Sequence, residues 1–369
     1  MGFFMSTPSL DFMQRALVLA EKGRGSTSPN PMVGAVVVRN GRVIGEGFHL
    51  APGADHAEIA ALRKAGKAAS GATLYVTLEP CCHTGRTGPC TDAVIAYGIK
   101  TVFAAVKDPN PAVNGRGIRI LRKAGITVST GLMREQATLL NDKYFGYHRH
   151  RRPFVILKTA QTLDGRIATA SGDSRWITSA ASRRFAHRLR AEVDAVAVGM
   201  GTVRSDNPAL TVRHVKGRNP YRIVLSRSLK FPPACRLLTD NKDYRTIIAG
   251  GEDAIERFSR TKKGRNLILW GVRLNRQGMP QIRDFLDKAA DFGLQSILLE
   301  GGGTLATAFL KAGLVDKYVL ITAPILCGQG VAAVGDLNIK KLGDAIRFEH
   351  GSFETCGIDN IFIGYPQRS

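Results

Sequence analysis

A histidine, a glutamate and two cysteines constrain this chain most, because a shared metal ion would force distant residues together. They occur as His56-Ala57-Glu58, Pro80-Cys81 and Cys90. One imidazole and two thiolates can hold a tetrahedral Zn²⁺ and leave its fourth position for water. A carboxylate that does not bind the metal can act as general acid and base. The pattern predicts one hydrolytic zinc site per chain, with Glu58 as the proton carrier.

The same residues resemble the H-x-E…P-C-x-x-C signature of zinc nucleobase deaminases. Eight residues separate Cys81 from Cys90, whereas the signature has two. Cys82 is a rival ligand, but Pro80-Cys81 carries the motif, so we take Cys82 as a bystander. The alternative, that these are ordinary core or loop residues, is disfavoured by the spacing.

Local sequence places the predicted ligands at element ends. His56 and Glu58 lie at the start of an amphipathic run that Asp55 is suited to cap. Cys90 opens a second helical run, where the helix dipole favours a thiolate. Cys81 follows an apolar strand. We therefore expect a zinc ion between two helix N-termini and a strand end.

Length and charge limit the other possibilities. A chain of 369 residues can form two domains, and we predict them at residues 6–150 and 151–369. The net charge of +22 favours anionic partners, either nucleic acid or small phosphorylated substrates. Six cysteines, three of them close together, suit a metal site in a reducing compartment, so we expect a cytoplasmic protein. No apolar run approaches the roughly 20 residues of a membrane span.

The order of elements predicts an α/β protein in both halves. The first half reads strand, strand, helix, strand, helix, strand, with a hairpin turn at Asn40-Gly41. In the second half, seven apolar β-rich runs alternate with helical stretches and predict a mostly parallel sheet. The segment 144–153 could contact phosphate or RNA, but it is interpreted as a basic linker with two partly buried tyrosines. The glycine turn 301–303 opens a helix whose free N–H groups could hold phosphate, although such a turn is often only a turn.

These motifs together resemble the bifunctional pyrimidine deaminase/reductase family of riboflavin biosynthesis. The matching segments run in family order over nearly the whole chain. They are Ser28-Pro-Asn-Pro-Met-Val-Gly34, His56-Ala-Glu58, Leu78-Glu-Pro-Cys81 with Gly85-Arg-Thr and Cys90, Asp108-Pro-Asn-Pro111, Lys158-Thr-Ala-Gln-Thr-Leu-Asp-Gly165, Trp176-Ile-Thr178, Asp206-Asn-Pro-Ala-Leu-Thr-Val-Arg213 and Glu300-Gly-Gly-Gly-Thr-Leu305. Two positions depart from the family pattern, Gly88 and Cys82, and neither removes a predicted ligand.

The resemblance implies a cytidine-deaminase-like α/β/α sandwich followed by an α/β domain resembling dihydrofolate reductase. The first would deaminate a phosphoribosylated diaminopyrimidine with zinc, and the second would reduce the ribosyl group to ribityl with NADPH. The implied deaminase substrate contacts are Asn30, His49, His83, Arg86, Asp108 and Asn110. The implied NADPH contacts are Ala160, Trp176, Thr202, Asp206, Gly302, Gly303, Thr304, Leu305, Ala306, Thr307 and Ala308. The implied reductase substrate contacts are Ser174, Arg190, Leu210, Arg213 and Glu300.

Two other functions fit parts of the sequence. A tRNA or nucleic-acid deaminase would explain the charge and the zinc signature, but not the second domain, which lacks an RNA-binding motif. A non-catalytic RNA-binding protein with structural zinc would have no need of Glu58. We therefore expect a small phosphorylated pyrimidine as the substrate, no nucleic-acid or membrane partner, and a homo-oligomer.

Overall fold

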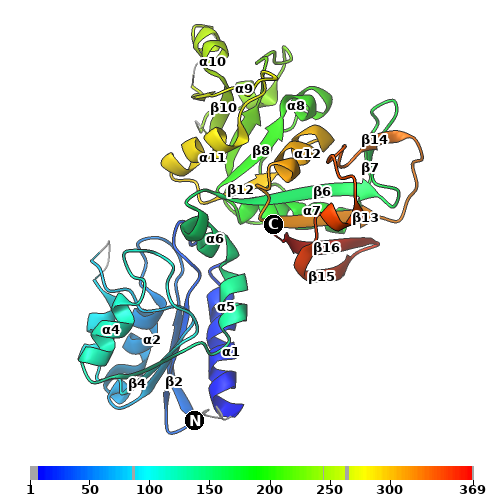
Figure 1. Ribbon diagram of the computed structural model, residues 1–369. Helices are drawn as coiled ribbons and strands as arrows, with labels where there is room; N and C mark the ends of the chain where they lie inside the picture. The colour runs from blue at the N-terminus through cyan, green and yellow to red at the C-terminus, as the bar shows by residue number, and fades with distance from the viewer. Residues whose placement is uncertain (1–6, 85–87, 244, 262–265, 368–369) are drawn as a thin grey trace. The chain divides into compact units, whose positions relative to one another are not determined.

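The computed structural model describes residues 7–84, 88–243, 245–261 and 266–367. Backbone contacts divide the chain into two compact units, Met1–His150 and Arg151–Ser369 (Figure 1). Each unit has its own main sheet, and each buries its own apolar side chains. Each unit therefore has the core that a separate domain requires.

The first unit is a five-stranded sheet in the order β2-β1-β3-β4-β5. β1 runs antiparallel to both β2 and β3, and β3, β4 and β5 are parallel. The strands are β1 (Gly34–Arg39), β2 (Arg42–Phe48), β3 (Thr73–Val76), β4 (Thr101–Ala104) and β5 (Thr127–Thr130). The helices are α1 (Thr7–Glu21), α2 (Ala57–Ala65), η1 (Gly66–Ala69), α3 (Cys90–Ala96), α4 (Arg116–Lys123), α5 (Arg134–Leu140) and α6 (Asp142–His150).

Helices cover both faces of this sheet. α1 packs on β1 and against α5, whereas α2 packs on β1 and β2 and is followed by α3 and α4 (Figure 1). One cluster of buried side chains, including Met13, Leu62 and Leu121, fills the space between helices and strands. This is the α/β/α sandwich that the sequence predicts.

Two glycines in β2 set the position of α2. A Cβ atom on Gly45 would lie 2.2 Å from the Ala61 carbonyl oxygen, and one on Gly47 would lie 2.6 Å from the Ala57 oxygen. The backbone of α2 therefore rests directly on β2, without side chains between them. The predicted turn at Asn40-Gly41 joins β1 to β2, and both turn residues have positive φ, as a two-residue hairpin turn of type I′ requires.

The second unit contains a nine-stranded sheet in the order β11-β10-β9-β8-β12-β6-β13-β16-β15, and a separate pair, β14-β7. Its strands are β6 (Phe154–Thr162), β7 (Arg166–Thr169), β8 (Ala195–Gly199), β9 (Tyr221–Leu225), β10 (Thr246–Gly251), β11 (Ile268–Val272), β12 (Ser296–Leu299), β13 (Lys317–Ala323), β14 (Gly330–Ala332), β15 (Phe348–Cys356) and β16 (Asp359–Pro366). Its helices are α7 (Ala180–Ala191), α8 (Met200–Asp206), α9 (Arg236–Thr239), α10 (Glu252–Ser259), α11 (Ile282–Asp291), α12 (Gly303–Lys311) and η3 (Leu342–Asp344).

Alternate residues of the parallel strands enter two different cores. Val155 and Leu157 of β6 join one cluster with α11 and α12, whereas Phe154 and Ile156 join another with α8, α9 and α10. Both faces of the sheet are thus covered. A strand buried on both faces needs apolar residues at every position, which is why these strands appear as continuous apolar runs in the sequence.

Three elements differ from what the sequence suggests. The segment interpreted as a basic linker forms most of helix α6, and Tyr144 within it is buried. The β15-β16 hairpin and the β7-β14 pair were not foreseen. β15 is exposed over most of its length and its pairing register shifts between Glu349 and Ser352, so it has neither an apolar run nor a regular alternation.

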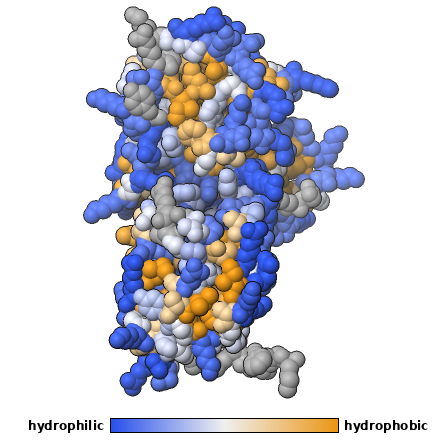
Figure 2. All heavy atoms as spheres, turned by 90° about the vertical axis from the view of Figure 1, so that its left-hand side faces the viewer, coloured by the Kyte–Doolittle hydropathy of each residue, from blue (hydrophilic) through white to orange (hydrophobic). Residues whose placement is uncertain are grey.

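The surface is mixed in character. Figure 2 shows hydrophilic residues over much of the visible face of each unit, with hydrophobic residues in smaller patches between them. Among the residues that the structure describes, no helix combines the length and the apolar character needed to cross a membrane.

Candidate active sites

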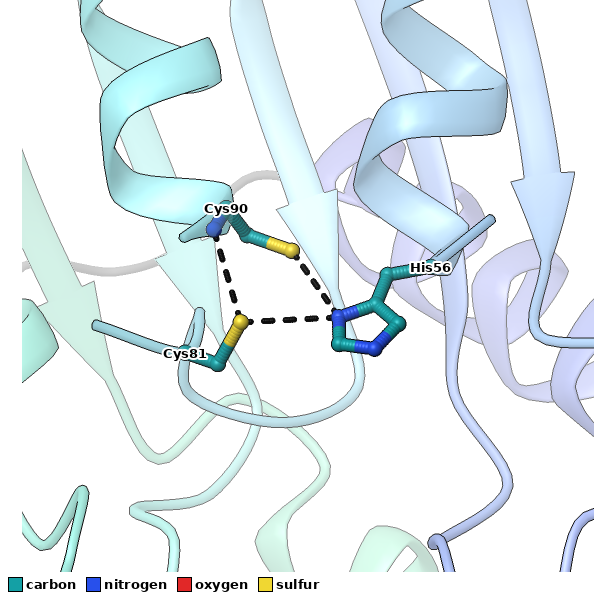
Figure 3. Close-up of side chains that lie close together, drawn as sticks. All are labelled: His56, Cys81 and Cys90. Atoms are coloured by element: carbon teal, nitrogen blue, oxygen red, sulfur yellow. Dashed lines mark hydrogen bonds between the residues drawn. The ribbon is translucent and has the colours of Figure 1, made fainter. Parts of the chain in front are cut away.

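The three predicted zinc ligands lie together in the first unit (Figure 3). His56 Nδ1 lies 3.2 Å from Cys90 Sγ and 3.4 Å from Cys81 Sγ. One ligand atom from each residue lies within 4.8 Å of the other two. An imidazole and two thiols at these distances fit the donor set of a zinc centre that keeps one open position.

Two of the ligands stand at helix N-termini, as the sequence suggests, whereas Cys81 lies five residues after its strand ends at Val76. His56 is the N-cap residue of α2, Cys90 is the first residue of α3, and Cys81 lies in the loop after β3. The expected role of Asp55 as the cap of α2 was wrong. The cap position makes no side-chain hydrogen bond, and the Asp55 carboxylate instead pairs with Arg63. The backbone N–H of Cys90 donates to Cys81 Sγ over 3.4 Å, and thus favours a thiolate there.

The electrostatics of this cluster favour metal binding. The Cys90 thiol and then the His56 imidazole hydrogen-bond to Cys81, and these contacts hold its pKa near 4 despite burial. The pKa of Cys90 is raised by its contact with the Cys81 thiolate and by burial. Cys81 is thus the thiolate of the pair, and a bound cation would favour ionisation of Cys90 as well.

Glu58 is only 4% exposed and lies in the first turn of α2. Burial, followed by the charge of Cys81, raises the pKa of Glu58 to about 7. A carboxyl group with a pKa near neutrality can both accept and donate a proton, which is what a general acid and base must do.

Four predicted substrate contacts of the first unit border this cluster. Asn30 Nδ2 donates to His49 Nε2 over 3.0 Å, and His49 Nδ1 donates to the Asp55 carbonyl oxygen over 3.2 Å. The His49 ring stands edge-on to the His56 ring, with centroids 5.2 Å apart. Burial lowers the pKa of His49, which keeps it in this neutral form.

The loop after β4 supplies the other two of these residues. Asp108 Oδ1 accepts the Asn110 N–H over 2.8 Å, and burial raises the pKa of Asp108 to about 6. The remaining two predicted contacts are less defined. His83 is exposed, and Arg86 lies outside the described residues. Cys82 points elsewhere, with its Sγ 3.9 Å from the Ala112 carbonyl oxygen.

In the second unit, an ion pair joins two of the predicted substrate contacts. Arg190 of α7 donates from Nε and Nη2 to the two carboxylate oxygens of Glu300, at 2.6 and 2.7 Å. Its Nη1 donates to the Thr211 carbonyl oxygen, so this guanidinium holds Glu300 rather than pointing to open space. Burial opposes ionisation of Glu300, but Arg190 outweighs it and lowers the Glu300 pKa to about 2.

Arg213 stands next to this pair. Its backbone N–H donates to His187 Nδ1 over 3.1 Å, and its side chain is exposed. Burial, and then the neighbouring charge of Arg190, lowers the pKa of Arg213. An exposed guanidinium beside a basic neighbour is suited to an anionic group of a substrate.

Glycines line the carboxyl ends of the adjacent parallel strands β8 and β12. A Cβ on Gly201 would meet no atom within 4 Å, and one on Gly302 would meet only Thr202 Oγ1 at 3.9 Å. The Thr202 hydroxyl accepts the Gly302 N–H over 3.2 Å. This open, backbone-lined cradle at the start of α12 fits the phosphate groups of a dinucleotide.

The other predicted cofactor contacts differ in burial and in the partners of their side chains. Ala306 is buried at 1% exposure, and Thr307 binds the Gly303 oxygen and the Gly335 N–H, so the side chains of these two serve the fold. Gly303 packs tightly, because a Cβ there would lie 2.4 Å from the Ala332 oxygen. Trp176 is 71% exposed.

The remaining predicted contacts of the second unit lie on several elements. Thr304, Leu305 and Ala308 lie in α12, Ala160 in β6, Asp206 at the end of α8, and Ser174 and Leu210 in loops. Arg175 donates to the Asp206 carbonyl oxygen over 3.3 Å, which brings the loop of Ser174 and Trp176 to the end of α8. Leu210 is 2% exposed, so its side chain belongs to the core.

Comparison with known proteins agrees with both halves of this description. Residues 6–106 match the cytidine and deoxycytidylate deaminase zinc-binding region, and residues 153–362 match the RibD C-terminal domain. The chain is 43% identical to riboflavin biosynthesis protein RibD of Aquifex aeolicus, across 96% of this chain and 97% of that protein. It is 41% identical to RibD of Escherichia coli, across 94% and 96%. The chain belongs to the RibD family.

Solved structures of RibD proteins share the fold. Acinetobacter baumannii RibD superposes with a TM-score of 0.87 at 35% identity, over 98% of this chain and 99% of that one. A diaminohydroxyphosphoribosylaminopyrimidine deaminase/5-amino-6-(5-phosphoribosylamino)uracil reductase of Thermotoga maritima gives 0.85 at 35% identity, over the same shares. The predicted fold class is confirmed, with a deaminase-like α/β domain before an α/β domain of the RibD C-terminal type.

Two further residues near these sites, Lys158 and Glu79, were given no role from the sequence. Lys158 is a lone lysine in the apolar strand β6, and burial lowers its pKa while Glu300 counteracts this. Glu79 accepts hydrogen bonds from three backbone N–H groups, those of Asp108, Gly115 and Ile118. The sequence does show a charged residue in an apolar, β-rich run at both positions. Their partners lie far away in sequence, so that signal alone does not reveal a role.

Proposed function

We propose that this chain catalyses two consecutive steps of riboflavin biosynthesis. In the first, a phosphoribosylated diaminopyrimidine is hydrolytically deaminated at a zinc centre. In the second, NADPH reduces the ribosyl group to ribityl. Residues 6–150 form the deaminase domain and residues 151–369 form the reductase domain. The proposal is carried by one observation, the cluster of His56, Cys81 and Cys90 with buried Glu58 beside it.

His56, Cys81 and Cys90 would hold a Zn²⁺ ion in this proposal. Bound there, the ion would lower the pKa of a water molecule and make it nucleophilic at neutral pH. Glu58 accepts a proton from the attacking water and delivers it to the ring nitrogen. It then takes the proton of the hydroxyl group added to the ring carbon and passes it to the departing amino group, so the C–N bond breaks, a carbonyl forms and ammonia leaves. The raised pKa of Glu58, about 7, supports both transfers.

The residues around the cluster orient the pyrimidine. Neutral His49 and Asn30 form one edge, and Asp108 with Asn110 forms another. His83 and Arg86 are assigned to the same substrate by resemblance alone. Because Asp108 is buried with a pKa near 6, it can bind ring amino groups as a carboxylate at neutral pH.

In the second domain, bound NADPH would supply a hydride to the sugar carbon attached to the amine, after the ribosyl ring has opened there by breaking its C–O bond to give an imine, and a proton added to the nitrogen completes the reduction. The glycine cradle at Gly201 and Gly302 would hold the cofactor phosphates. Thr202 and Asp206 of α8 and residues 303–308 of α12 would form further cofactor contacts. Arg213 binds the substrate phosphate, and Arg190 fixes the Glu300 carboxylate toward the sugar. Ser174 and the backbone of Leu210 complete the proposed substrate contacts, since the Leu210 side chain belongs to the core.

The substrate we propose is a small phosphorylated pyrimidine, with no nucleic-acid or membrane partner. We also propose a cytoplasmic location, supported by free cysteines at all six positions. A homo-oligomer is supported by Phe353, 80% exposed on the edge strand β15. Size-exclusion chromatography with light scattering tests the assembly, and a monomer would contradict it.

A coupled assay tests the main proposal. The phosphoribosylated diaminopyrimidine is supplied to the zinc-loaded chain, and ammonia release and NADPH absorbance are followed together. We expect ammonia release followed by NADPH oxidation, with both stopped by a zinc chelator. Supplying the deaminated intermediate should restore NADPH oxidation in the presence of chelator. Absence of ammonia release would overturn the deaminase assignment, and absence of NADPH oxidation from the intermediate would overturn the reductase assignment.

A further inference from the structure

The corner between helices α5 and α6, residues 134–150, lies outside the deaminase match at 6–106, yet it contacts two of the loops around the metal cluster. Its polar contacts come from Asn141, between the two helices, and Tyr144, in the first turn of α6. Both side chains are buried, at 4% and 8% exposure. A buried polar group is costly unless it is hydrogen-bonded, so its partners are informative.

Asn141 binds the loop that carries Asn30. The Met32 backbone N–H donates to Asn141 Oδ1 over 2.8 Å, and Asn141 Nδ2 donates to the Met32 carbonyl oxygen over 2.8 Å. One carboxamide thus satisfies both backbone groups of Met32, much as a neighbouring strand would. Met32 is two residues from Asn30, which itself pairs with His49, so the position of Asn30 depends on this contact.

Tyr144 binds the loop that carries Asp108 and Asn110. Its hydroxyl donates to Asp108 Oδ1 over 3.0 Å, the same oxygen that accepts the Asn110 N–H. Burial raises the pKa of Tyr144, so the hydroxyl remains protonated and can only donate to this carboxylate. The Asp108 carboxylate is therefore oriented from α6, by a residue far away in sequence.

We propose that Asn141 and Tyr144 are positioning residues for deamination, which hold the Asn30 loop and the Asp108–Asn110 loop at the spacing that the pyrimidine requires. This inference rests on the proposed function of those loops as substrate contacts. It also gives a function to the last two helices of the first unit, of which the sequence suggests only a basic linker from residue 144 onward.

The test uses the full-length, zinc-loaded chain and compares Tyr144→Phe with Tyr147→Phe. Tyr147 lies on the same helix, but the hydroxyl that binds Asp108 belongs to Tyr144. The Tyr147 variant therefore removes a hydroxyl from α6 and leaves the bond to Asp108 in place. We expect Tyr144→Phe to raise the deaminase KM about tenfold and to change kcat much less, because a hydrogen bond to a charged group is lost. Tyr147→Phe should leave both constants unchanged, and zinc content and reductase turnover should match the wild type in both variants.

A second pair of variants tests the other contact. Asn141→Ala removes both hydrogen bonds to Met32, whereas Asn141→Asp keeps an acceptor for the Met32 N–H. We expect the deaminase KM to rise in both, and to rise more in Asn141→Ala. A deaminase KM within twofold of wild type in Tyr144→Phe would overturn the inference, as would loss of zinc in parallel with deamination. A wild-type chain that releases no ammonia would instead overturn the proposed function.

Discussion

The two candidate sites differ in how the chain assembles them. The metal cluster draws its ligands from residues 56–90, two at helix N-termini and one in the loop after β3. The Arg190–Glu300 pair and Arg213 come from α7, the end of β12 and the loop after α8, which lie far apart in sequence. Both sites place polar groups at strand or helix ends, where α/β folds expose them.

This difference decides what chemistry can be inferred from sequence. Zinc accepts few donor types, so a histidine and two cysteines in a short stretch identify the metal and the open position together. Arginines and glutamates have many structural roles, and the Arg190–Glu300 pair would pass for an ordinary buried salt bridge without the family resemblance. Variants in each site, measured for both activities, test whether the two sites act independently.

The largest effect is expected from a pair of adjacent cysteines. Cys81→Ser should reduce the zinc content well below one per chain and abolish deamination, because Cys81 is the thiolate of the cluster. Cys82→Ser should retain zinc and activity, since its Sγ lies against the Ala112 carbonyl. Atomic absorption and ammonia release measure both. Zinc loss in Cys82→Ser with retention in Cys81→Ser would reverse our ligand assignment.

Glu58→Gln should keep zinc and lower the deaminase kcat by about 10²–10⁴-fold, because the amide cannot carry the proton. Reductase turnover with the deaminated intermediate should be unchanged, which makes each preparation its own control. If ammonia release persisted at the wild-type rate with zinc bound, Glu58 would have to be removed from the mechanism.

Glu300 links the second site to stability. Its folded pKa, about 2, lies below its ordinary value of 4.5, so ionised Glu300 stabilises the fold above pH 4.5 and this contribution is lost as pH falls toward 2. Both tryptophans, Trp176 and Trp270, lie in the second unit, so their fluorescence reports its unfolding selectively.

The matched variant Glu300→Gln leaves Arg190 without its partner. At pH 7 we expect a loss of about 3 kcal/mol in the free energy of unfolding, and a weaker dependence on pH between 4.5 and 2. Urea unfolding followed by tryptophan fluorescence measures both. An unchanged slope in that pH range would contradict a depressed pKa for Glu300.

The smallest effect should come from Arg213→Ala. The exposed guanidinium makes charge-assisted bonds to substrate in our proposal, so the reductase KM should rise about tenfold with the deaminase KM unchanged. Lys216→Ala, an exposed cation in the same loop, serves as the control for net charge. Steady-state kinetics with the deaminated intermediate separate the two variants. Equal increases in both would mean that Arg213 acts only through long-range charge.

Much of the fold follows from the sequence for a simple reason. The parallel strands are buried on both faces, and their apolar runs leave no other interpretation. The β15-β16 hairpin was not predicted because most residues of β15 are exposed. Its exposed Phe353 and shifted pairing register also break the alternation expected of a strand. Helix α6 was taken for a linker because basic residues dominate its sequence. Partly buried tyrosines were expected there, but the hydrogen bond from Tyr144 to Asp108 was not.

The metal site, like the fold, was predicted only in part. The zinc ligands were predicted from chemistry, and the structure brings them together, whereas the cap role of Asp55 failed because Arg63 takes its carboxylate. The residues that hold the loops, Glu79 and Asn141, bind backbone groups of partners distant in sequence. A side chain that recognises backbone leaves no matching side-chain pattern, so its role appears only when the partners are placed.

The close approach of β2 to α2 affects which positions of this protein can vary. Gly45 and Gly47 have no side chain and supply no metal ligand, yet the helix they support begins at the residue after His56. An added methyl group at either glycine must push α2 outward and take the imidazole and Glu58 with it. A random mutagenesis screen for lost deamination should therefore recover these two glycines among the inactive variants, although neither performs chemistry.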